Sequence, residues 1–414
     1  MTVRPRALVI AYACEPGRGS EPGAGWGLVR ALSEFADCVV LVGPAHSEGL
    51  ANWKRSHPNA PLEFVTVPER AYPTPAWRGR IGWFVAYLRW LPVARRTALS
   101  LNASQAFDIA WHATYSVFWL PSPVHTLGIP SVWGPVGGAV TTPPPLWRLL
   151  GFRGALTDLV DRFAVMALSW LPSVRTIPRS ASVVIVQNEA TRDRLPSPVA
   201  ASAVVLNHAL FVEVEAAPVT SVRRTRTLLL ASSLESRKGV SLVLRAMMLV
   251  PVDVDLTIVG DGPERERLER FVQRSGLATR VHFLGQVPRE ILQALFNQSA
   301  AAVFTGLREE GGLALAEAMY GGAHVIVLDH GGAATIARFG TDQGRVTRVP
   351  VGSVDDTVRN LAAAMTRAVG TLSAERGPTI DRAAVRDTLH NAFSTALAAP
   401  TTRRVVSPSM PHQR

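Results

Sequence analysis

Short runs of apolar residues, each bounded by turn-forming residues, recur along most of the chain. In the first half they cover residues 7–13, 38–43, 62–67, 107–113, 130–136 and 181–188. In the second half they cover residues 227–232, 255–260, 280–285, 300–306 and 323–329. The runs are continuously apolar rather than alternating, which is typical of parallel strands that helices cover on both faces. The pattern predicts an α/β protein with two doubly wound sheets.

A segment without helical or strand periodicity, residues 212–226, separates the two groups of runs. The chain has 414 residues, which is long enough for two separate cores. We therefore expect one Rossmann-like domain at residues 1–215 and a second at 222–395. Two such domains would face each other across a cleft at the carboxyl ends of both sheets. Residues 397–414 are polar, basic and proline-rich, and we expect this tail to be disordered.

The formal net charge of +11 favours anionic partners such as nucleotides, phospholipid head groups or nucleic acid. The sequence has no RNA-binding aromatic motif, zinc-finger spacing or basic helix with heptads, so we expect no nucleic-acid partner. Two cysteines, Cys14 and Cys38, form neither a disulfide framework nor a zinc site, which fits core thiols in a cytoplasmic protein. No apolar stretch reaches the length of a spanning helix, so we expect a soluble or peripheral protein.

The loop after the first predicted strand, within residues 15–32, contains five glycines. Glycine lets backbone amides approach an anion closely, and the helix that follows offers its positive end. A dinucleotide-binding fold would need a third glycine where Leu28 stands, and an acidic residue where the second strand ends in Gly43 and Pro44. We therefore reject a nicotinamide dehydrogenase and favour an anion-binding loop, with a surface turn as the alternative.

A second anion site is predicted in SSLESRKG, where Lys238 and Gly239 open a helix after a strand. The chain has only one other lysine, Lys54, and Arg237 stands next to Lys238. A compact ammonium group at the carboxyl end of a sheet can neutralise a diphosphate. The alternative is a solvated helix start, but cations there oppose the helix dipole. This conflict favours an anionic ligand.

The stretch REEGGLALAEAM, residues 308–319, places three carboxylates in an otherwise apolar run. We expect Glu309 in a loop at the cleft and Glu317 in the second turn of the next helix, where they would contact a sugar and a ribose. Gly311 and Gly312 would expose backbone amides to a phosphate or a sugar hydroxyl. An acidic pair favoured by the helix dipole is the alternative for Glu309 and Glu310, but it leaves Glu317 unexplained. We assign no role to Glu310.

These residues resemble the E-x7-E element of retaining glycosyltransferases of the GT-B fold, especially glycosyltransferase family 4. Glu309 and Glu317 match its two acids, and Gly312 and Leu313 match the pair between them. SSLESRKG is similar to the G-R-L-x-x-x-K-G element of that family, and VGDGPERERLE, RVHFLG and AMYGGAHVIVLDHGGAATI follow in the family's order. AYACEPGRGSEPGAGW, HATYSVFWLPSP and VWGPVGG resemble a bacterial branch of the same family.

The resemblance implies an acceptor-side first domain and a second domain that binds a nucleotide-diphosphate sugar. In that reading Lys238 holds the diphosphate, Glu317 the ribose and Glu309 the transferred sugar. The other implied contacts are those of His112 with the sugar, of Gly25 with the phosphate, and of the amides of Gly311, Gly312 and Leu313 with both. Ser233 stands where the family has an arginine, and Arg237 is the predicted substitute; Gly311 and His324 replace the family's phenylalanine and proline.

The resemblance further implies a retaining, metal-independent enzyme without a cofactor, acting on a glycan or lipid-linked acceptor in cell-envelope or exopolysaccharide synthesis. A catalytically silent nucleotide-sugar-binding protein and a sugar-nucleotide epimerase are the alternatives. Residues 77–96 mix tryptophans and arginines. As a helix, this segment would lie on an anionic membrane surface, at the inner face of the membrane, or line an acceptor site for a lipid-linked sugar. The alternative is a helix that packs inside the first domain.

Overall fold

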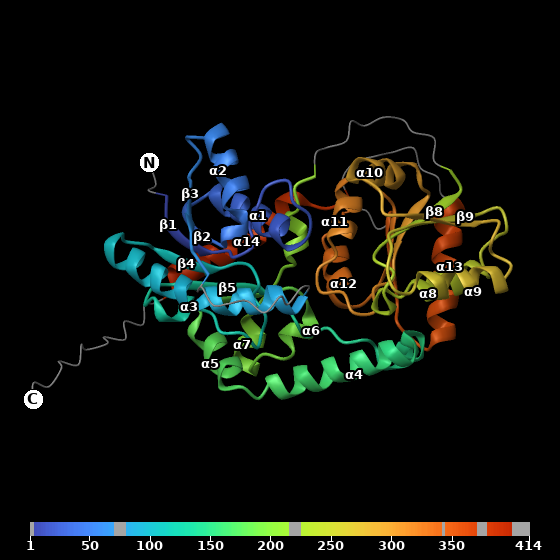
Figure 1. Cartoon of the computed structure of the whole chain (residues 1–414), viewed down its shortest axis with the longest axis horizontal. Coiled ribbons are helices and arrows are strands. Elements are labelled where there is room, and N and C mark those ends of the chain that lie inside the picture. Colours follow the sequence, from blue (N-terminus) through green and yellow to red (C-terminus); the bar gives the residue numbers. More distant parts are fainter. Residues whose placement is uncertain (1–3, 70–79, 215–224, 342–343, 371–378, 400–414) are drawn as a thin grey trace, which may run out of the picture.

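The computed structural model describes residues 4–69, 80–214, 225–341, 344–370 and 379–399 (Figure 1). These residues form two parallel sheets, one from each half of the chain, with helices packed around them. The prediction of an α/β protein with two doubly wound sheets is confirmed.

The first sheet has seven strands in the order β3-β2-β1-β4-β5-β6-β7, all parallel. Its strands are β1 Arg6–Ile10, β2 Asp37–Val42, β3 Leu62–Thr66, β4 Ile109–His112, β5 Ser131–Val136, β6 Val183–Val186 and β7 Val204–Val205. The helices of this half are α1 Ser20–Ser33, α2 Ser47–Ser56, α3 Arg80–Ser104, α4 Gly151–Leu168, α5 Pro172–Ser180, α6 Glu189–Arg192 and α7 Ser197–Ser202. Its 3-10 helices are η1 Pro44–His46, η2 Val124–Thr126, η3 Pro144–Leu150 and η4 His208–Phe211.

The second sheet has six parallel strands in the order β10-β9-β8-β11-β12-β13. Its strands are β8 Thr227–Ala231, β9 Asp255–Val259, β10 Val281–Gly285, β11 Ala301–Phe304, β12 Val325–Leu328 and β13 Val346–Val349. The helices of this half are η5 Ser236–Lys238, α8 Val240–Met247, α9 Arg265–Arg274, α10 Arg289–Gln298, α11 Leu313–Tyr320, α12 Gly331–Arg338, α13 Val354–Gly370 and α14 Arg382–Ala398.

Burial on both faces explains why the predicted runs form strands. In β1, Ala7 and Val9 face one core cluster while Leu8 and Ile10 face another, as successive strand residues must. Every predicted run contains a strand, and the structure adds the edge strands β7 and β13. β13 begins and ends with a buried valine, but Thr347 and Arg348 between them are not buried, so it lacks the continuous apolar signal of a central strand.

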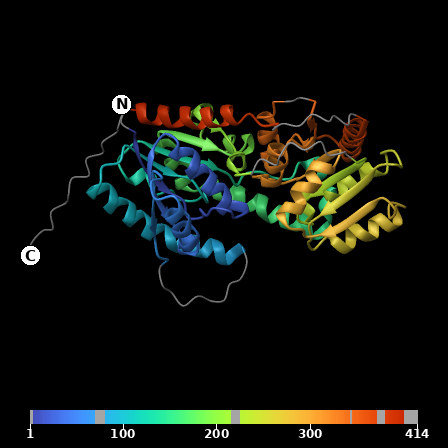
Figure 2. The ribbon, with the colours of Figure 1, turned by 90° about the horizontal axis from the view of Figure 1, so that it is seen from above.

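Helix α14 packs on the first sheet, although it follows the second sheet in the chain (Figure 2). The Phe393 ring contacts the Trp111 ring edge-on at a centroid distance of 5.0 Å, and Arg386 lies 3.3 Å from Glu34. The predicted boundary at residue 395 places most of this helix with the second domain, whereas these contacts join it to the first. Residues 215–224 between the sheets and the tail from residue 400 lie outside the described residues.

Helix α3 contains residues 80–96 of the predicted membrane-surface segment, whereas residues 77–79 lie outside the described part of the chain. Tyr87 and Trp90 are fully buried, and their rings stack with centroids 6.1 Å apart. Trp90 Nε1 donates a hydrogen bond to the carbonyl of Val67 at 3.1 Å. These aromatic residues therefore pack inside the first domain, as the alternative interpretation of this segment proposes.

Both cysteines are free and buried. Burial raises the pKa of Cys38 to about 12 and also raises the pKa of Cys14. Thiols that stay protonated are poor nucleophiles and metal ligands, so both act as small core residues.

Candidate functional site

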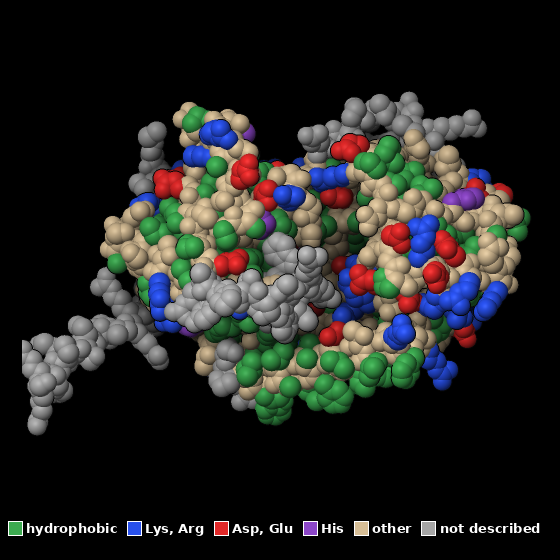
Figure 3. Space-filling model, in the orientation of Figure 1, with side chains coloured by type: hydrophobic (Ala, Val, Ile, Leu, Met, Phe, Trp, Pro, Cys, Tyr) green, Lys and Arg blue, Asp and Glu red, His purple; other side chains and the backbone are tan. Residues whose placement is uncertain are grey.

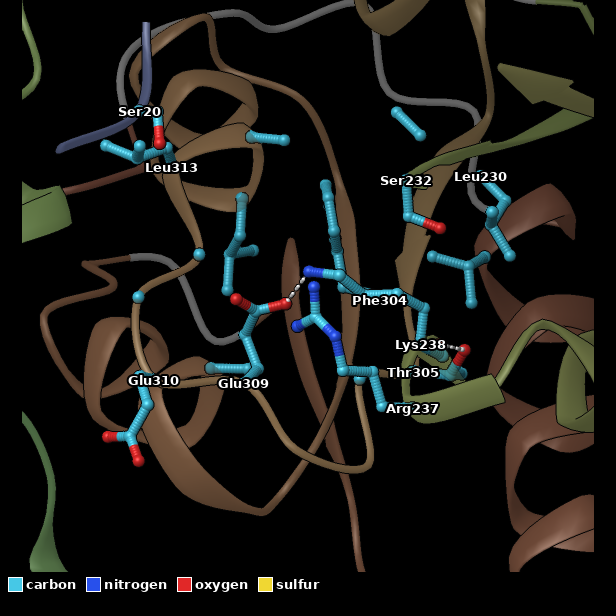
Figure 4. Close-up of a pocket in the computed structure, with 18 of the residues that line it drawn as sticks. Ser20, Leu230, Ser232, Arg237, Lys238, Phe304, Thr305, Glu309, Glu310 and Leu313 are labelled. Atoms are coloured by element: carbon cyan, nitrogen blue, oxygen red, sulfur yellow. Dashed lines mark hydrogen bonds and ion pairs between the residues drawn. The ribbon is translucent and has the colours of Figure 1, made fainter. Parts of the chain in front are cut away.

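A cavity of about 480 Å³ lies at the carboxyl ends of β8 and β11, where the start of α1 from the first half of the chain closes it. Six of the predicted site residues line it together (Figure 4): Arg237, Lys238, Glu309, Gly311, Gly312 and Leu313. Its polar and glycine lining consists of Ser20, Glu21, His208, Ser232, Arg237, Lys238, Thr305, Gly306, Glu309, Glu310, Gly311 and Gly312. We call it the first cavity.

Lys238 and Glu309 form an ion pair inside the first cavity. Lys238 ends η5 and is followed by Gly239 at φ 66°, where a Cβ atom would lie 2.2 Å from the carbonyl oxygen of Thr305. Glycine is therefore required at this turn. The Thr305 hydroxyl donates to the carbonyl of Lys238 at 3.2 Å and joins the turn to the end of β11. Lys238 and Glu309 are 71 positions apart in the chain, and the adjacent strands β8 and β11 bring them together.

Arg237 also lines the first cavity and lies beside the Lys238–Glu309 pair (Figure 4). Its Nε donates to Glu235 at 2.6 Å, and the Ser233 hydroxyl donates to the other carboxylate oxygen at 3.0 Å. Burial opposes ionisation of Glu235, but the hydrogen bond and charge of Arg237 lower its pKa. Ser233 thus helps to hold Arg237, which supplies a cation in a region where the family's arginine is missing.

Two helices begin at the first cavity. Gly311, Gly312 and Leu313 line it at the start of α11, and Gly312 has φ 122°, a backbone conformation that favours glycine. Ser20 lines it at the start of α1 with φ 60°, which is unusual for a residue with a side chain. No side chain caps either helix start. Their positive ends therefore favour an anion in this cavity.

A second, larger cavity of about 1020 Å³ lies in the first half of the molecule. It adjoins the first cavity because Ser20, Glu21, His208 and Glu310 line both. The other side chains of the second cavity belong to Glu15, Arg18, Pro22, Ala45, His46, Tyr115, Ser116, Val117, Trp119 and Gln187. The lining thus combines aromatic, carboxylate and amide groups, which suits a ligand with many hydroxyl groups.

Two buried polar atoms in the second cavity have no hydrogen-bond partner among the described residues. They are His46 Nε2 and Gln187 Oε1, whose residues are 4% and 7% exposed. His46 Nδ1 lies 2.9 Å from Glu15. Burial opposes ionisation of Glu15, but hydrogen bonds from His46 and Arg18 lower its pKa. Such atoms are costly to leave unpaired, so the wall of the second cavity holds two polar groups that the described residues do not satisfy.

Glu310 joins the two halves of the molecule. Its carboxylate accepts hydrogen bonds from the Val140 amide at 2.7 Å and from Asn188 Nδ2 at 2.8 Å, and its carbonyl accepts one from Asn207 at 2.7 Å. Burial raises its pKa although Val140 and Asn188 donate to the carboxylate. Gly311 next to it lies against His208, whose Nε2 would be 2.9 Å from a Cβ atom. Glu310 and Gly311 therefore both serve contacts between the halves, and the sequence prediction missed the role of Glu310.

Three predicted residues do not line either cavity. His112 is fully buried, with its ring nitrogens 3.0 Å from the hydroxyls of Tyr87 and Ser122, and burial lowers its pKa to about 3. Gly25 is buried, and a Cβ atom there would lie 2.1 Å from the carbonyl of Ala13, so it permits close packing of α1. His112 and Gly25 therefore lie in the core, and their predicted contacts with the sugar and the phosphate stay predictions.

Glu317 points toward α10 and pairs with Arg289 at 2.8 Å. Burial raises the pKa of Glu317, whereas the charge of Arg289 works in the opposite direction. Its predicted contact with a ribose stays a prediction.

The residues shared by both cavities were the ones that the sequence pattern did not single out. Glu21 and Ser20 belong to the predicted glycine-rich loop, so their position carried a signal, whereas His208 stands in a segment without a motif.

Within the described residues, no group of three or more His, Cys, Asp or Glu side chains is arranged to hold a metal ion. None of the helices in the described part of the chain is both long and apolar enough to cross a membrane.

Comparisons with known proteins agree with this architecture. Residues 214–368 match the family described as glycosyl transferases group 1. The 2-deoxystreptamine N-acetyl-D-glucosaminyltransferase of Streptomyces fradiae is 34% identical over 137 residues, which is 32% of this chain and 29% of that protein. The chain thus matches less than a third of the length of this curated relative.

Solved structures share the fold of the whole chain. The lipopolysaccharide outer core galactosyltransferase WaaB matches with a TM-score of 0.56 and 13% identity, over 95% of this chain and 99% of that one. A sucrose-phosphate synthase of Thermosynechococcus elongatus matches with a TM-score of 0.52 and 17% identity, over 96% and 100%. HepE of Anabaena, solved with UDP and glucose, matches with a TM-score of 0.50 and 15% identity, over 94% and 100%.

These matches confirm the GT-B fold of two facing α/β domains. The family match spans the six-stranded sheet, which carries Lys238, Glu309 and the start of α11. This half of the chain is therefore similar to the glycosyl transferases group 1.

Proposed function

We propose that the protein transfers a sugar from a nucleotide-diphosphate sugar in the first cavity to an acceptor in the second. The observation that carries this proposal is the shared lining of Ser20, Glu21, His208 and Glu310. A sugar bound at this boundary is within reach of groups from both cavities. The family match and the UDP and glucose bound to HepE support a nucleotide-sugar donor.

The chemistry follows from the charges in the first cavity. When the bond between the sugar and the diphosphate breaks, the leaving nucleoside diphosphate takes the electron pair and the anomeric carbon becomes electron-deficient. The acceptor hydroxyl oxygen bonds to that carbon, and its proton passes to the leaving diphosphate. Lys238, Arg237 and the two helix starts neutralise the diphosphate. Glu309, which Lys238 orients, lies where a carboxylate stabilises the positive sugar. Retention of anomeric configuration, with Glu309 as an orienting group, is part of the proposal.

The acceptor we propose is a glycan or lipid-linked sugar. Tyr115 and Trp119 offer aromatic faces to sugar rings in the second cavity, and His46 and Gln187 are polar side chains of its lining. We place the reaction in the cytoplasm, in cell-envelope or exopolysaccharide synthesis. The N-terminal motifs that resemble the bacterial branch of the family support this context.

The test is a transfer assay with UDP-glucose, UDP-galactose and UDP-N-acetylglucosamine, each with a panel of glycans and with 2-deoxystreptamine, the acceptor named for the Streptomyces fradiae relative. We expect acceptor-dependent release of UDP and a product with the donor's anomeric configuration by NMR. An altered sugar nucleotide formed without acceptor would indicate an epimerase. Thermal stabilisation by donors without any turnover would indicate a silent binding protein. Either result would overturn the proposal.

A further inference from the structure

Helix α4 carries a row of large apolar side chains on its solvent side. Counting the turn that follows the helix, the row consists of Phe152, Leu156, Leu159, Val160, Phe163, Met166, Trp170 and Leu171, which are 37% to 86% exposed. The spacing of three or four residues places those within the helix on one side of it. Figure 3 shows hydrophobic side chains as a band along the lower edge of the molecule, where α4 lies in Figure 1. We call these residues the α4 face.

The two acidic residues of α4, Asp158 and Asp161, lie away from this row and are paired with arginines. Asp158 is buried and accepts hydrogen bonds from Thr142 at 2.7 Å, Trp147 at 2.7 Å and Arg162 at 2.8 Å. Arg308 forms an ion pair with Asp161. This polarity is the reverse of that expected for a water-exposed surface helix, whose apolar side faces the core. The α4 face is therefore built to meet an apolar environment.

Both halves of the molecule hold α4 in place. Its start packs against η3, and a Cβ atom on Gly154 would lie 2.5 Å from the Ser236 hydroxyl of η5. Arg308 ties the helix to the loop that carries Glu309. The helix is roughly 27 Å long and presents one continuous ridge. Because the helix is held in place, its row of apolar side chains can contact a flat surface along its whole length.

The charges near the α4 face select an anionic lipid surface over a second copy of the chain. Arg148 and Arg153 are exposed at its start, and the carboxylates of the helix, Asp158 and Asp161, are paired with arginines away from the ridge. The chain carries a net charge of +11, so two copies repel each other while an anionic surface attracts either one. Phenylalanine, leucine and tryptophan on an amphipathic helix are also the residues that insert at a lipid interface.

We propose that the α4 face docks the protein on the anionic surface of a membrane. The surface lies outside the linings of both cavities, so the inference stands or falls independently of the sugar transfer. Phe152 and Phe163 enter the acyl boundary, while Arg148 and Arg153 contact the head groups. Salt weakens the binding because part of the attraction is electrostatic.

The test is co-sedimentation of the full chain with vesicles of phosphatidylcholine mixed with phosphatidylglycerol, and with phosphatidylcholine alone. We expect salt-sensitive binding to the mixed vesicles and weaker binding to the neutral ones. The double substitution Phe152→Ser and Phe163→Ser should reduce the partition coefficient at least about tenfold. Its thermal unfolding should match that of the unchanged chain because both side chains are exposed.

The matched control removes two exposed apolar side chains from the other half of the molecule, Leu249→Ser with Val252→Ser. It should bind the mixed vesicles as the unchanged chain does. Equal loss in the control, or no binding of the unchanged chain, would overturn the proposal. Light scattering should also be used to look for self-association. If the chain self-associates and the Phe152 and Phe163 substitutions abolish this, the α4 face binds a second copy instead, and the proposal is overturned.

Discussion

The two cavities differ in how the chain builds them. The first takes its cations from neighbouring residues, Arg237 and Lys238, and its acid and glycines from a single loop at residues 309–312. The second draws its lining from many separate segments between Glu15 and Glu310. The difference follows from the ligands we propose: a diphosphate needs charges and backbone amides, which short motifs supply, whereas an acceptor needs hydrogen-bonding groups placed in three dimensions.

The partnering of polar groups differs in the same way. In the first cavity Lys238 pairs with Glu309, and Arg237 pairs with Glu235. In the second cavity, His46 Nε2 and Gln187 Oε1 are buried without a partner among the described residues. The charged groups named in the first cavity therefore pair with one another, whereas the wall of the second cavity keeps two polar atoms unpaired.

The largest effect is expected from Lys238→Ala. This substitution removes the cation nearest to Glu309 and leaves that carboxylate without its ion-pair partner. We expect kcat/KM for the donor to fall at least about 100-fold in the transfer assay. The control is Lys54→Ala, because the other lysine of the chain bonds to the carbonyl of Ala60 away from both cavities. A fall of less than about tenfold would contradict the assignment of the first cavity to the donor.

A smaller effect is expected from Gln187→Leu in the second cavity. The leucine removes the unpaired oxygen, so thermal stability should stay equal or rise, even though one 3.3 Å hydrogen bond to Pro135 is lost. KM for the acceptor should rise about tenfold while KM for the donor stays the same. If both KM values change together, the two cavities do not divide the substrates as proposed.

The smallest effect on turnover is expected at His112, which is fully buried in the core and lines neither cavity. His112→Gln should keep neutral-pH turnover close to that of the unchanged chain, since the ring lines neither cavity. A tenfold loss in a variant that remains folded would return His112 to the site.

The same residue predicts a pH dependence of stability. The pKa of His112 is about 3 in the folded chain against 6.5 ordinarily, so the unfolded chain binds the proton more tightly. The contribution of His112 to the free energy of unfolding is fully present above pH 6.5. It is lost at about 1.4 kcal/mol per pH unit as the pH falls from 6.5 toward 3. Urea unfolding at several pH values should show a shallower loss in His112→Gln. An equal slope in both proteins would show that the histidine does not remain neutral in the fold.

Much of the fold and of the first cavity was predictable from local sequence. Continuous apolar runs predicted the central strands, and glycines and charges after strands predicted Lys238, Arg237, Glu309, Gly311 and Gly312 at one site. Residues at the carboxyl ends of adjacent parallel strands meet at one sheet edge, so position along the chain implies position in space.

The sequence said least about the direction of side chains and about contacts between distant residues. His112 ends β4, as a site residue would, but its side chain turns into the core toward Tyr87. The aromatic residues of 77–96 that the structure describes are buried, while the apolar face open to solvent belongs to α4. Helical periodicity shows that a face is apolar, but not whether that face points inward.

The sequence by itself determined the two parallel sheets, the order of their elements and the chemical character of the first cavity, because strand burial and anion binding depend on neighbouring residues. Only the tertiary structure decided the second cavity, the role of Glu310 between the halves and the outward apolar face of α4. Those features depend on contacts such as Glu310 with Val140 and Asn188, which join residues 170 and 122 positions apart. Packing of the whole chain, and not local preference, sets such contacts.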